Sequence, residues 1–350
     1  MQRPVQRVLI VGGGIAGLTA ALRLAEHGHG VTLVEREHVL GGNANTVCCK
    51  AIDGRCQLCG ACLLADALEA ARTHPALEVL TDTRLTGLSR ANGSFSTSLS
   101  APGGDRTASA DAVLLASGFD HIPAGAKGPY GCGTLPAVTT GAEVERRLKT
   151  EGQAAYDDER LRRVAFIQCV GSRDEHVGRG YCSQVCCRYA LRLARVFKAR
   201  RPETEVTLFK MDIQHAGRDS AAAWRAAPGE GIRIVAGLPA VVRRAPEDPL
   251  QAEFLYDDIL AARLGRETFD MVVLSTGMQP RQDAGSLAAL ADLNLDRFGF
   301  FATREDGVST RAPGVFVAGA CGAPRSIAES AAHAQIAAQA CHRYLQEKGA

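Results

Sequence analysis

The sequence lacks three features that direct a chain to particular partners or places. Its formal net charge is only +2 over 350 residues, which is too small to indicate a nucleic-acid partner. No apolar run approaches the roughly 20 residues that cross a bilayer, and the first residues lack the apolar segment and cleavage site of a secretory signal. We therefore expect a cytoplasmic protein with no membrane span and no nucleic-acid partner.

The composition is ordinary except for cysteine. Hydrophobic residues make up 46% and charged residues 22% of the chain, and its length favours two domains over one. It also has twelve cysteines, and clustered cysteines in a reducing compartment indicate metal or redox chemistry rather than structural disulfides. The first group contains Cys48, Cys49, Cys56, Cys59 and Cys62, and the second contains Cys169, Cys182, Cys186 and Cys187.

The start of the chain predicts a nucleotide-binding unit. An apolar strand at 7–11 leads into a glycine turn at 12–17 that matches G-x-G-x-x-G. A helix rich in Ala and Leu follows at 18–27, and then a second strand at 31–34 that ends at Glu35. A glycine motif alone is weak evidence, but strand, turn, helix, strand and acid within about 30 residues make nucleotide binding the favoured interpretation.

Each residue of this motif has a physical reason. Gly12 allows the tight turn, Gly14 lets the backbone approach a pyrophosphate, and Gly17 lets the helix pack on the strand. The helix N-terminus stabilises the phosphates, and Glu35 can accept a ribose hydroxyl.

Later segments indicate which nucleotide is bound. Residues 41–44, GGNA, follow Glu35 at a spacing that resembles flavoproteins of the thioredoxin reductase and glutathione reductase superfamily, which favours FAD over NAD. Residues 111–118 and 313–320 resemble two further flavin segments of that superfamily, with Ala320 at the place of an acid. The expected FAD-binding residues are Gly12, Gly14, Ala16, Gly17, Glu35, Arg36, Gly42, Asn43, Ser117, Gly118, Gly319 and Ala320.

A second α/β unit is predicted between these flavin segments. Its closing strand, at 271–277, echoes residues 112–118, as in two related nucleotide-binding domains. We expect an α/β fold with two Rossmann-like dinucleotide-binding domains, as in thioredoxin reductase. The predicted parts are 1–134 for the first half of the FAD domain, 135–280 for the inserted domain and 281–350 for the second half of the FAD domain.

The inserted domain lacks the second glycine motif. After the strand predicted at 164–168, residues 169–174 read CVGSRD, where a conventional NAD(P)H site would have G-x-G-x-x-G. This absence argues against such a site.

The second cysteine group occupies that place, at the spacing C-x12-C-x3-C-C. A helix predicted from Ser183 onward would put Cys182 and Cys186 on one face, because they are four residues apart. Cys187 is adjacent, and Cys169 approaches from the strand end. Four such thiolates favour a [4Fe–4S] cluster over zinc, which usually shows C-x2–4-C knuckles. The alternative without a ligand is a set of small buried residues.

The first cysteine group allows three interpretations. Cys56, Cys59 and Cys62 begin like a bacterial ferredoxin motif, but Asp66 stands where the fourth cysteine would be, and the pair at 48–49 could replace it. Glutathione-reductase-like enzymes carry a redox-active cysteine pair at a similar place after their Gly-Gly. The group could therefore bind a cluster, handle redox or sulfur chemistry, or have no direct role. Cys56, Cys59 and Cys62 are the candidate catalytic residues.

Three further residues have less specific expectations. His333 lies on the last predicted helix, where a packing or surface role is favoured and a position that faces the flavin region is the alternative. Arg173 and Asp174 are expected to orient the loop of the second cysteine group or to pair with each other.

Two long segments carry a resemblance to a known family. IQCVGSRDE…YCSQVCCRYAL resembles the cluster-binding signature of the A-type subunits of heterodisulfide reductases, and GVFVAGACGAPRSIAESAAHAQIAA resembles the C-terminal flavin segment of that family. The resemblance implies that the first glycine motif binds FAD. It also implies one [4Fe–4S] cluster, with the ligands Cys169, Cys182, Cys186 and Cys187.

The chain resembles the compact form of that family. It lacks the ferredoxin-like insertions of the methanogen form, and its CCKAIDGRCQLCGAC segment looks like the A-type component of the sulfur-oxidising heterodisulfide reductase-like complex. That resemblance implies B-type and C-type partner subunits, a lipoate-binding protein and a homodimer. The expected function is electron transfer between FAD, the cluster and a disulfide-type or sulfane substrate in cytoplasmic sulfur oxidation. The alternatives are a stand-alone NAD(P)H-dependent disulfide reductase and a non-enzymatic sulfur-carrier scaffold.

Overall fold

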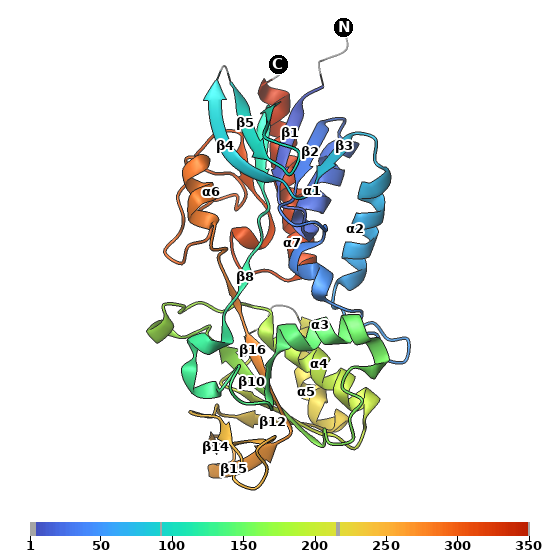
Figure 1. Ribbon diagram of the computed structural model, residues 1–350, viewed down its shortest axis with the longest axis vertical. Coiled ribbons are helices and arrows are strands. Elements are labelled where there is room, and N and C mark those ends of the chain that lie inside the picture. The colour runs from blue at the N-terminus through green and yellow to red at the C-terminus, as the bar shows by residue number, and fades with distance from the viewer. Residues whose placement is uncertain (1–4, 92, 215–217, 349–350) are drawn as a thin grey trace. The chain divides into compact units, whose positions relative to one another are not determined.

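The chain divides into two compact units. The computed structural model describes residues 5–91, 93–214 and 218–348 (Figure 1). The second unit consists of Thr46–Cys59 and His121–Met278, and the described residues outside these two ranges form the first unit. The sequence assigned residues 46–59 and 121–134 to the first domain, whereas in the structure both segments pack with the inserted domain.

A five-stranded parallel sheet forms the centre of the first unit. The strand β1 is buried at four of its five residues because both faces of the sheet are covered, which explains its uninterrupted apolar sequence. The order in the sheet is β18 (Val315–Val317), β7 (Ala112–Leu115), β1 (Arg7–Val11), β2 (Gly30–Val34) and β3 (Leu77–Leu80).

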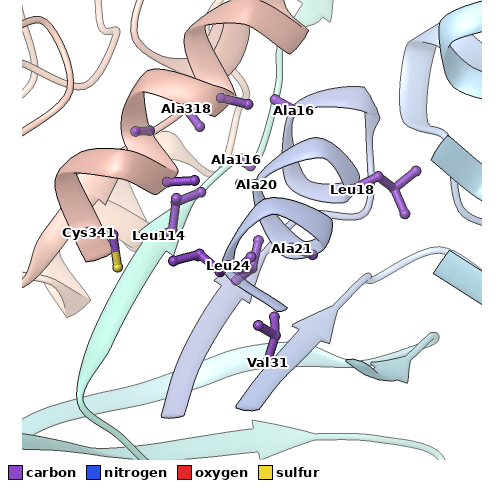
Figure 2. Close-up of a cluster of buried hydrophobic side chains, with 14 of the residues drawn as sticks. Ala16, Leu18, Ala20, Ala21, Leu24, Val31, Leu114, Ala116, Ala318 and Cys341 are labelled. Atoms are coloured by element: carbon purple, nitrogen blue, oxygen red, sulfur yellow. The ribbon is translucent and has the colours of Figure 1, made fainter. Parts of the chain in front are cut away.

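The two faces of β1 belong to different cores. Val8 and Ile10 pack with residues of helices α1 (Ile15–Glu26) and α7 (Ile327–Lys348). Figure 2 shows small side chains of α1, among them Ala16 and Ala20, in this cluster. Alanines let α1 and α7 lie close together over the sheet, and α1 is thereby fixed at the carboxyl end of β1.

The opposite face of this sheet packs on a smaller antiparallel sheet and a short helix. Leu9 and Val11 share a core with Phe95 of that sheet. The remaining elements of the unit are α2 (Ala61–Thr73), β4 (Arg84–Ala91), β5 (Ser94–Ser100), β6 (Arg106–Ala110) and α6 (Ala284–Leu290).

The second unit repeats this architecture. Its central strand β10 is buried along seven of its eight residues. Val164 and Phe166 face the core that contains α4 (Cys186–Arg200), and Ala165 and Ile167 face the opposite core. The sheet order is β12 (Ile232–Ala236), β11 (Glu205–Lys210), β10 (Arg163–Val170), β16 (Met271–Thr276) and β9 (Val138–Thr140), all parallel.

Two further helices and a small antiparallel sheet complete the second unit. The sheet contains β13 (Arg243–Arg244), β14 (Ala252–Asp258) and β15 (Arg263–Phe269), and the helices are α3 (Gly141–Glu151) and α5 (Arg218–Ala226). The chain passes between the units at β8 (Asp120–His121), at β17 (Met278–Gln279) and at both ends of the segment 46–59. Among the described residues, no helix has the length and apolar character needed to span a membrane.

Three histidines meet where α1 and α7 end. His29 Nε2 lies 2.8 Å from His342 Nδ1, and the His27 ring stacks on His342 with centroids 4.1 Å apart. Burial lowers the pKa of both His29 and His342. Positive charge on His27 also lowers both pKa values, and Arg23 lowers the pKa of His342. The Asp111 carboxylate opposes these shifts by raising the pKa of His29.

This cluster predicts a loss of stability in mild acid. Because the folded protein holds these pKa values below that of a free histidine, the unfolded chain takes up protons more readily once the pH falls below about 6.5. The two histidines therefore contribute fully to the stability of the fold above about pH 6.5, and this contribution is lost as the pH falls below that value. We expect the thermal midpoint to fall less between pH 7.5 and pH 5.5 in His342→Asn than in the parent protein. Equal falls would contradict this assignment.

Candidate functional site

Close packing requires glycine at two places in the turn after β1. A Cβ on Gly12, whose φ is +111°, would lie 2.4 Å from the Ala116 carbonyl oxygen. A Cβ on Gly17 would lie 1.8 Å from the Gly12 carbonyl oxygen. Both distances are shorter than a van der Waals contact, so these glycines are needed for the fold itself.

Gly14 differs from its neighbours because the space beside it is open. The nearest atom to a Cβ placed there is the Gly41 carbonyl oxygen, at 3.9 Å. Gly14 is also the N-cap of α1, and its φ of −75° suits any residue. No described residue of the folded chain therefore requires glycine at this position. A ligand phosphate that approaches the backbone at the helix N-terminus would provide the reason.

Glu35 is held at the same turn. Its side chain is buried, with only 7% of the residue exposed. One carboxylate oxygen accepts the Gly13 N–H at 2.7 Å and the other accepts the Glu37 N–H at 2.9 Å. Each oxygen has a second acceptor site, so the predicted ribose contact remains possible in this position. Arg36, in contrast, directs its guanidinium to Asp283 at 2.7 Å.

The Gly-Gly-Asn segment joins the first turn. The Gly41 N–H donates to the Gly13 carbonyl at 2.8 Å. Asn43 donates through Nδ2 to the Phe119 carbonyl at 2.7 Å. The first bond holds Gly41 against the glycine turn, and the contact of Gly42 and Asn43 with FAD stays a prediction.

Ser117 provides a sign of a missing ligand. It follows β7, next to Gly12, and its hydroxyl oxygen is buried without a hydrogen-bond partner among the described residues. A buried polar atom without a partner carries a desolvation cost. A bound nucleotide at the carboxyl ends of β1 and β7 would satisfy it, and Gly118 follows directly.

The late flavin segment also returns to α1. Gly319 has a φ of +75°, and a Cβ there would lie 2.5 Å from the Ala16 Cβ. Its N–H donates to His333 Nδ1 at 2.9 Å, and His333 Nε2 lies 2.9 Å from the Gly307 carbonyl. Burial lowers the pKa of His333. A neutral ring with its proton on Nε2 fits both bonds, so His333 positions the Gly319 turn.

Sequence reasoning missed Arg325 at this place. Its guanidinium donates to the Gly319 carbonyl at 2.9 Å, and burial lowers its pKa. It puts a positive charge beside Gly319 and Ala320. Ala320 is buried and has no polar side-chain atom, so its predicted contact with the flavin would have to come from its backbone.

The second cysteine group lines the connection between β10 and α4. The pairing of β10 with β16 shifts register between Ile167 and Val170, and Cys169 within this irregularity has a φ of +58°. The sequence placed Cys182 on a helix with Cys186, and this is wrong because α4 begins at Cys186. Cys182 instead lies in the loop, where its sulfur accepts the Gln184 N–H at 3.3 Å.

Long-range hydrogen bonds fix this loop. The Met278 N–H donates to the Ser183 hydroxyl at 2.9 Å, and the Tyr189 hydroxyl donates to the Thr276 carbonyl at 3.1 Å. Arg173 and Asp174 do not pair with each other. Arg173 pairs with Asp212, and Asp174 pairs with Lys127 at 2.9 Å.

The four thiols influence one another. Burial, together with the nearby Cys187 and Cys182 thiols, raises the pKa of Cys169 to about 11. Burial also raises the pKa of Cys186, and the thiols at 169, 187 and 182 add to the effect. Buried thiols that disfavour one another's charge need a cation to become thiolates, which suits a cluster-binding set.

The geometry of the described residues contains no group of three Cys, His, Asp or Glu side chains arranged around a single metal ion. Each cysteine of a [4Fe–4S] cube binds a different iron atom, so a cube does not require thiols that converge on one point. The cluster therefore stays a prediction.

The structure separates the candidate catalytic cysteines. Cys56 and Cys59 belong to the second unit, whereas Cys62 lies in α2 of the first unit. Cys48 also belongs to the second unit, and the Cys59 sulfur lies 3.7 Å from its carbonyl oxygen.

Comparison with known proteins gives this geometry a context. A family model described as "Pyridine nucleotide-disulphide oxidoreductase" matches residues 6–340. The chain is 28% identical to the A-type iron-sulfur subunit of CoB–CoM heterodisulfide reductase of Methanocaldococcus jannaschii, over 95% of this chain and 63% of that protein. It is 35% identical to the A-type subunit of the H(2):CoB-CoM heterodisulfide,ferredoxin reductase of Methanothermobacter marburgensis, over 65% of this chain and 36% of that protein.

Among solved structures, thioredoxin reductase of Lactococcus lactis superposes with a TM-score of 0.64 at 18% identity, covering 98% of this chain and 99% of that one. The predicted fold class and the resemblance to the A-type subunits of heterodisulfide reductases are thereby confirmed. The chain spans less than two thirds of the length of these curated relatives.

Two alanine substitutions separate binding from folding in the glycine turn. Gly14→Ala should fold with the thermal midpoint of the flavin-free parent protein and lose bound flavin, because its Cβ meets no described protein atom closer than 3.9 Å but occupies the open space. Gly17→Ala should destabilise the fold because its Cβ clashes with the Gly12 carbonyl at 1.8 Å. The measurements are the flavin absorbance of the purified protein and thermal unfolding. Full flavin content in Gly14→Ala would place the nucleotide elsewhere.

Proposed function

Because this chain belongs to the family of pyridine nucleotide-disulphide oxidoreductases, we propose that it is an electron-transfer subunit that contains FAD and a [4Fe–4S] cluster. FAD takes up two electrons and can release them one at a time, and the cluster relays single electrons. The protein's own part is to hold both groups and to set their potentials by burial and hydrogen bonds.

The observation that carries the proposal is the thiol-lined connection between β10 and α4. At the corresponding place the first unit has an open glycine turn, which suits a phosphate. In the second unit, the glycine that follows β10 has no open space beside it, because a Cβ on Gly171 would lie 2.5 Å from Ile122 Cγ2. Four mutually interacting thiols, three of them buried, occupy this place instead.

The residues of the first unit fit FAD. The open face of Gly14, the partnerless Ser117 hydroxyl and the buried Glu35 carboxylate lie around the carboxyl ends of β1, β2 and β7. The carboxyl ends of parallel strands are where nucleotides bind in such sheets. Arg325 adds a positive charge at the Gly319 turn, which favours a reduced, anionic flavin ring.

The relatives' names support a place in a larger assembly. Both curated relatives are named as A-type subunits of a heterodisulfide reductase. We propose B-type and C-type subunits as partners, a lipoate-binding protein as a further partner, a homodimeric state and a cytoplasmic role in sulfur oxidation. The substrate would be a disulfide or sulfane group.

Removal of one buried thiol tests the cluster. Cys186→Ala should lose most of the iron, from about four irons per chain, while FAD stays bound in the other unit. Anaerobic quantification of iron, sulfide and flavin measures this. Cys132→Ala is the matched control, because Cys132 also lies in the second unit but outside the thiol-lined loop. Full iron content in Cys186→Ala would move the ligands elsewhere.

Reduced pyridine nucleotides discriminate between the proposal and a stand-alone reductase. We expect NADH or NADPH alone to leave the flavin absorbance of the anaerobic protein unchanged, because Ile122 closes Gly171 and the glycine motif is missing. Dithionite serves as the positive control and should bleach the flavin. Rapid bleaching by NADH or NADPH would establish the stand-alone reductase instead.

A further inference from the structure

Helix α4 holds the segment 46–59 through hydrogen bonds to backbone carbonyls of a turn within that segment. The Arg192 guanidinium donates to the Gln57 carbonyl at 2.7 Å and to the Leu58 carbonyl at 2.6 Å. Arg195 also reaches the Gln57 side chain, at 3.4 Å. Ile52 and Cys48 pack against the core of the second unit. In Figure 1 this segment is the blue loop beside α3 in the second unit.

A buried ion pair lies under this loop. Lys50 Nζ lies 2.5 Å from Glu145 Oε2 of α3, and the two side chains are only 1% and 9% exposed. Lys50 also donates to the Cys48 carbonyl at 3.1 Å. A buried pair of this kind recovers little more than its own desolvation cost. Stability alone therefore does not explain it, and its position points to chemistry at Cys48.

Two thiols meet at this ion pair. The Cys48 thiol is directed at Glu145 Oε2, with its sulfur 3.9 Å away. The Cys59 sulfur lies 3.7 Å from the Cys48 carbonyl, and Arg192 lies within electrostatic range of the Cys59 thiol. Cys48 and Cys59 are partly exposed residues, neither buried nor fully exposed. A site that acts on a dissolved disulfide needs such exposure.

We propose that Cys48 and Cys59 form a redox-active thiol pair that reduces a disulfide substrate, with Glu145 as the base for Cys48. Lys50 holds Glu145 in place, and Arg192 holds the turn that carries Cys59. This thiol pair deepens the proposed electron-transfer function. It rests on that function in one respect only, because the electrons that reduce the Cys48–Cys59 disulfide back to two thiols would come from it.

The exchange balances without any further reactant. Glu145 takes the Cys48 proton, and the thiolate attacks one sulfur of the disulfide RS–SR. The S–S bond breaks, and the leaving RS⁻ takes that proton to give RSH. Cys59 then attacks the Cys48 sulfur, and its own proton goes to the second RSH. The disulfide is reduced to two thiols, and Cys48 and Cys59 are oxidised to a disulfide.

Burial shifts the pKa of the acid and that of the thiol in the same direction. It raises the pKa of Glu145, which makes this carboxylate a stronger base, and it also raises the pKa of Cys48, so the thiol keeps its proton until a base removes it. The Lys50 ammonium opposes both shifts.

The same geometry disfavours the other early cysteines. Cys56 is exposed, and its sulfur accepts the N–H of Leu58 at 3.3 Å within its own turn. Cys62 belongs to the other unit. The sequence named Cys56, Cys59 and Cys62 as candidates, whereas the contacts of the second unit select Cys59 together with Cys48.

Peptide mapping tests the pair directly. Anaerobic holoprotein with reduced thiols is treated with 2-hydroxyethyl disulfide, blocked with N-ethylmaleimide and cleaved with trypsin without reduction. We expect one linked product, which joins the peptide that ends at Lys50 to the peptide that begins at Cys56. Cys59→Ser should stop the reaction at a mercaptoethanol adduct on Cys48. Cys49→Ser is the matched control and should leave the linked product unchanged.

Several outcomes would overturn the proposal. A linked product that persists in Cys48→Ser, or adducts on the exposed Cys49 and Cys56 alone, would exclude the assigned pair. Loss of iron in Cys48→Ser or Cys59→Ser would make them ligands instead. Iron and flavin are measured in the same samples. If the linked product forms in protein that contains no iron, the thiol pair stands and only the proposed cluster is contradicted.

The role of Glu145 has a separate readout. Glu145→Gln should slow the reaction of Cys48 at neutral pH by about tenfold or more, and the difference should shrink as the pH rises and the thiol ionises without a base. The double variant Lys50→Met/Glu145→Gln avoids an unpaired buried ammonium and should show the same pH dependence. A rate difference that stays constant with pH would reduce Glu145 to a structural role.

Discussion

The packing of α4 on its sheet is the constraint on which the chemistry of the second unit depends. Its apolar face, which includes Leu193 and Phe197, is buried against β10 and β11. Its first two residues are cysteines of the proposed cluster, and Arg192 and Arg195 on the same helix hold the segment 46–59. A shift of α4 would therefore move Cys186, Cys187 and the segment that carries Cys48 and Cys59, so one hydrophobic contact positions residues of both proposed sites.

The two units show how one architecture would serve the two proposed types of ligand. In the first, close packing uses glycine at Gly12 and Gly17 and leaves Gly14 open. In the second, Ile122 covers Gly171, and a longer loop extends from the strand end to α4. A phosphate needs bare backbone N–H groups, whereas a cluster needs side chains that reach inward from a wider turn. The length of the connection between strand and helix thus decides which ligand the sheet can take.

Local sequence patterns predicted those parts that local forces determine. The buried strands at 7–11 and 164–168, the glycine turn and the segment at 41–43 follow from apolar runs and glycine spacing. The start of α4 could not be predicted, because it depends on bonds from Ser183 and Tyr189 to residues about 90 positions away. The same holds for the segment 46–59, which Arg192 binds from about 135 positions away. The roles of His333 and Arg325 also depend on contacts that no local pattern encodes.

Helix α4 carries two of the proposed cluster ligands and also holds the segment with the proposed thiol pair, and this has a mechanistic consequence. Cys187 and Arg192 are five residues apart on α4, which corresponds to about 7.5 Å along the helix axis. A disulfide takes up two electrons, whereas a cluster delivers one at a time. The thiols must therefore keep their position between two successive transfers. A helix fixed by a buried core, with its loop held through backbone carbonyls rather than flexible side chains, meets that requirement, because the loop cannot move without breaking the bonds to Arg192.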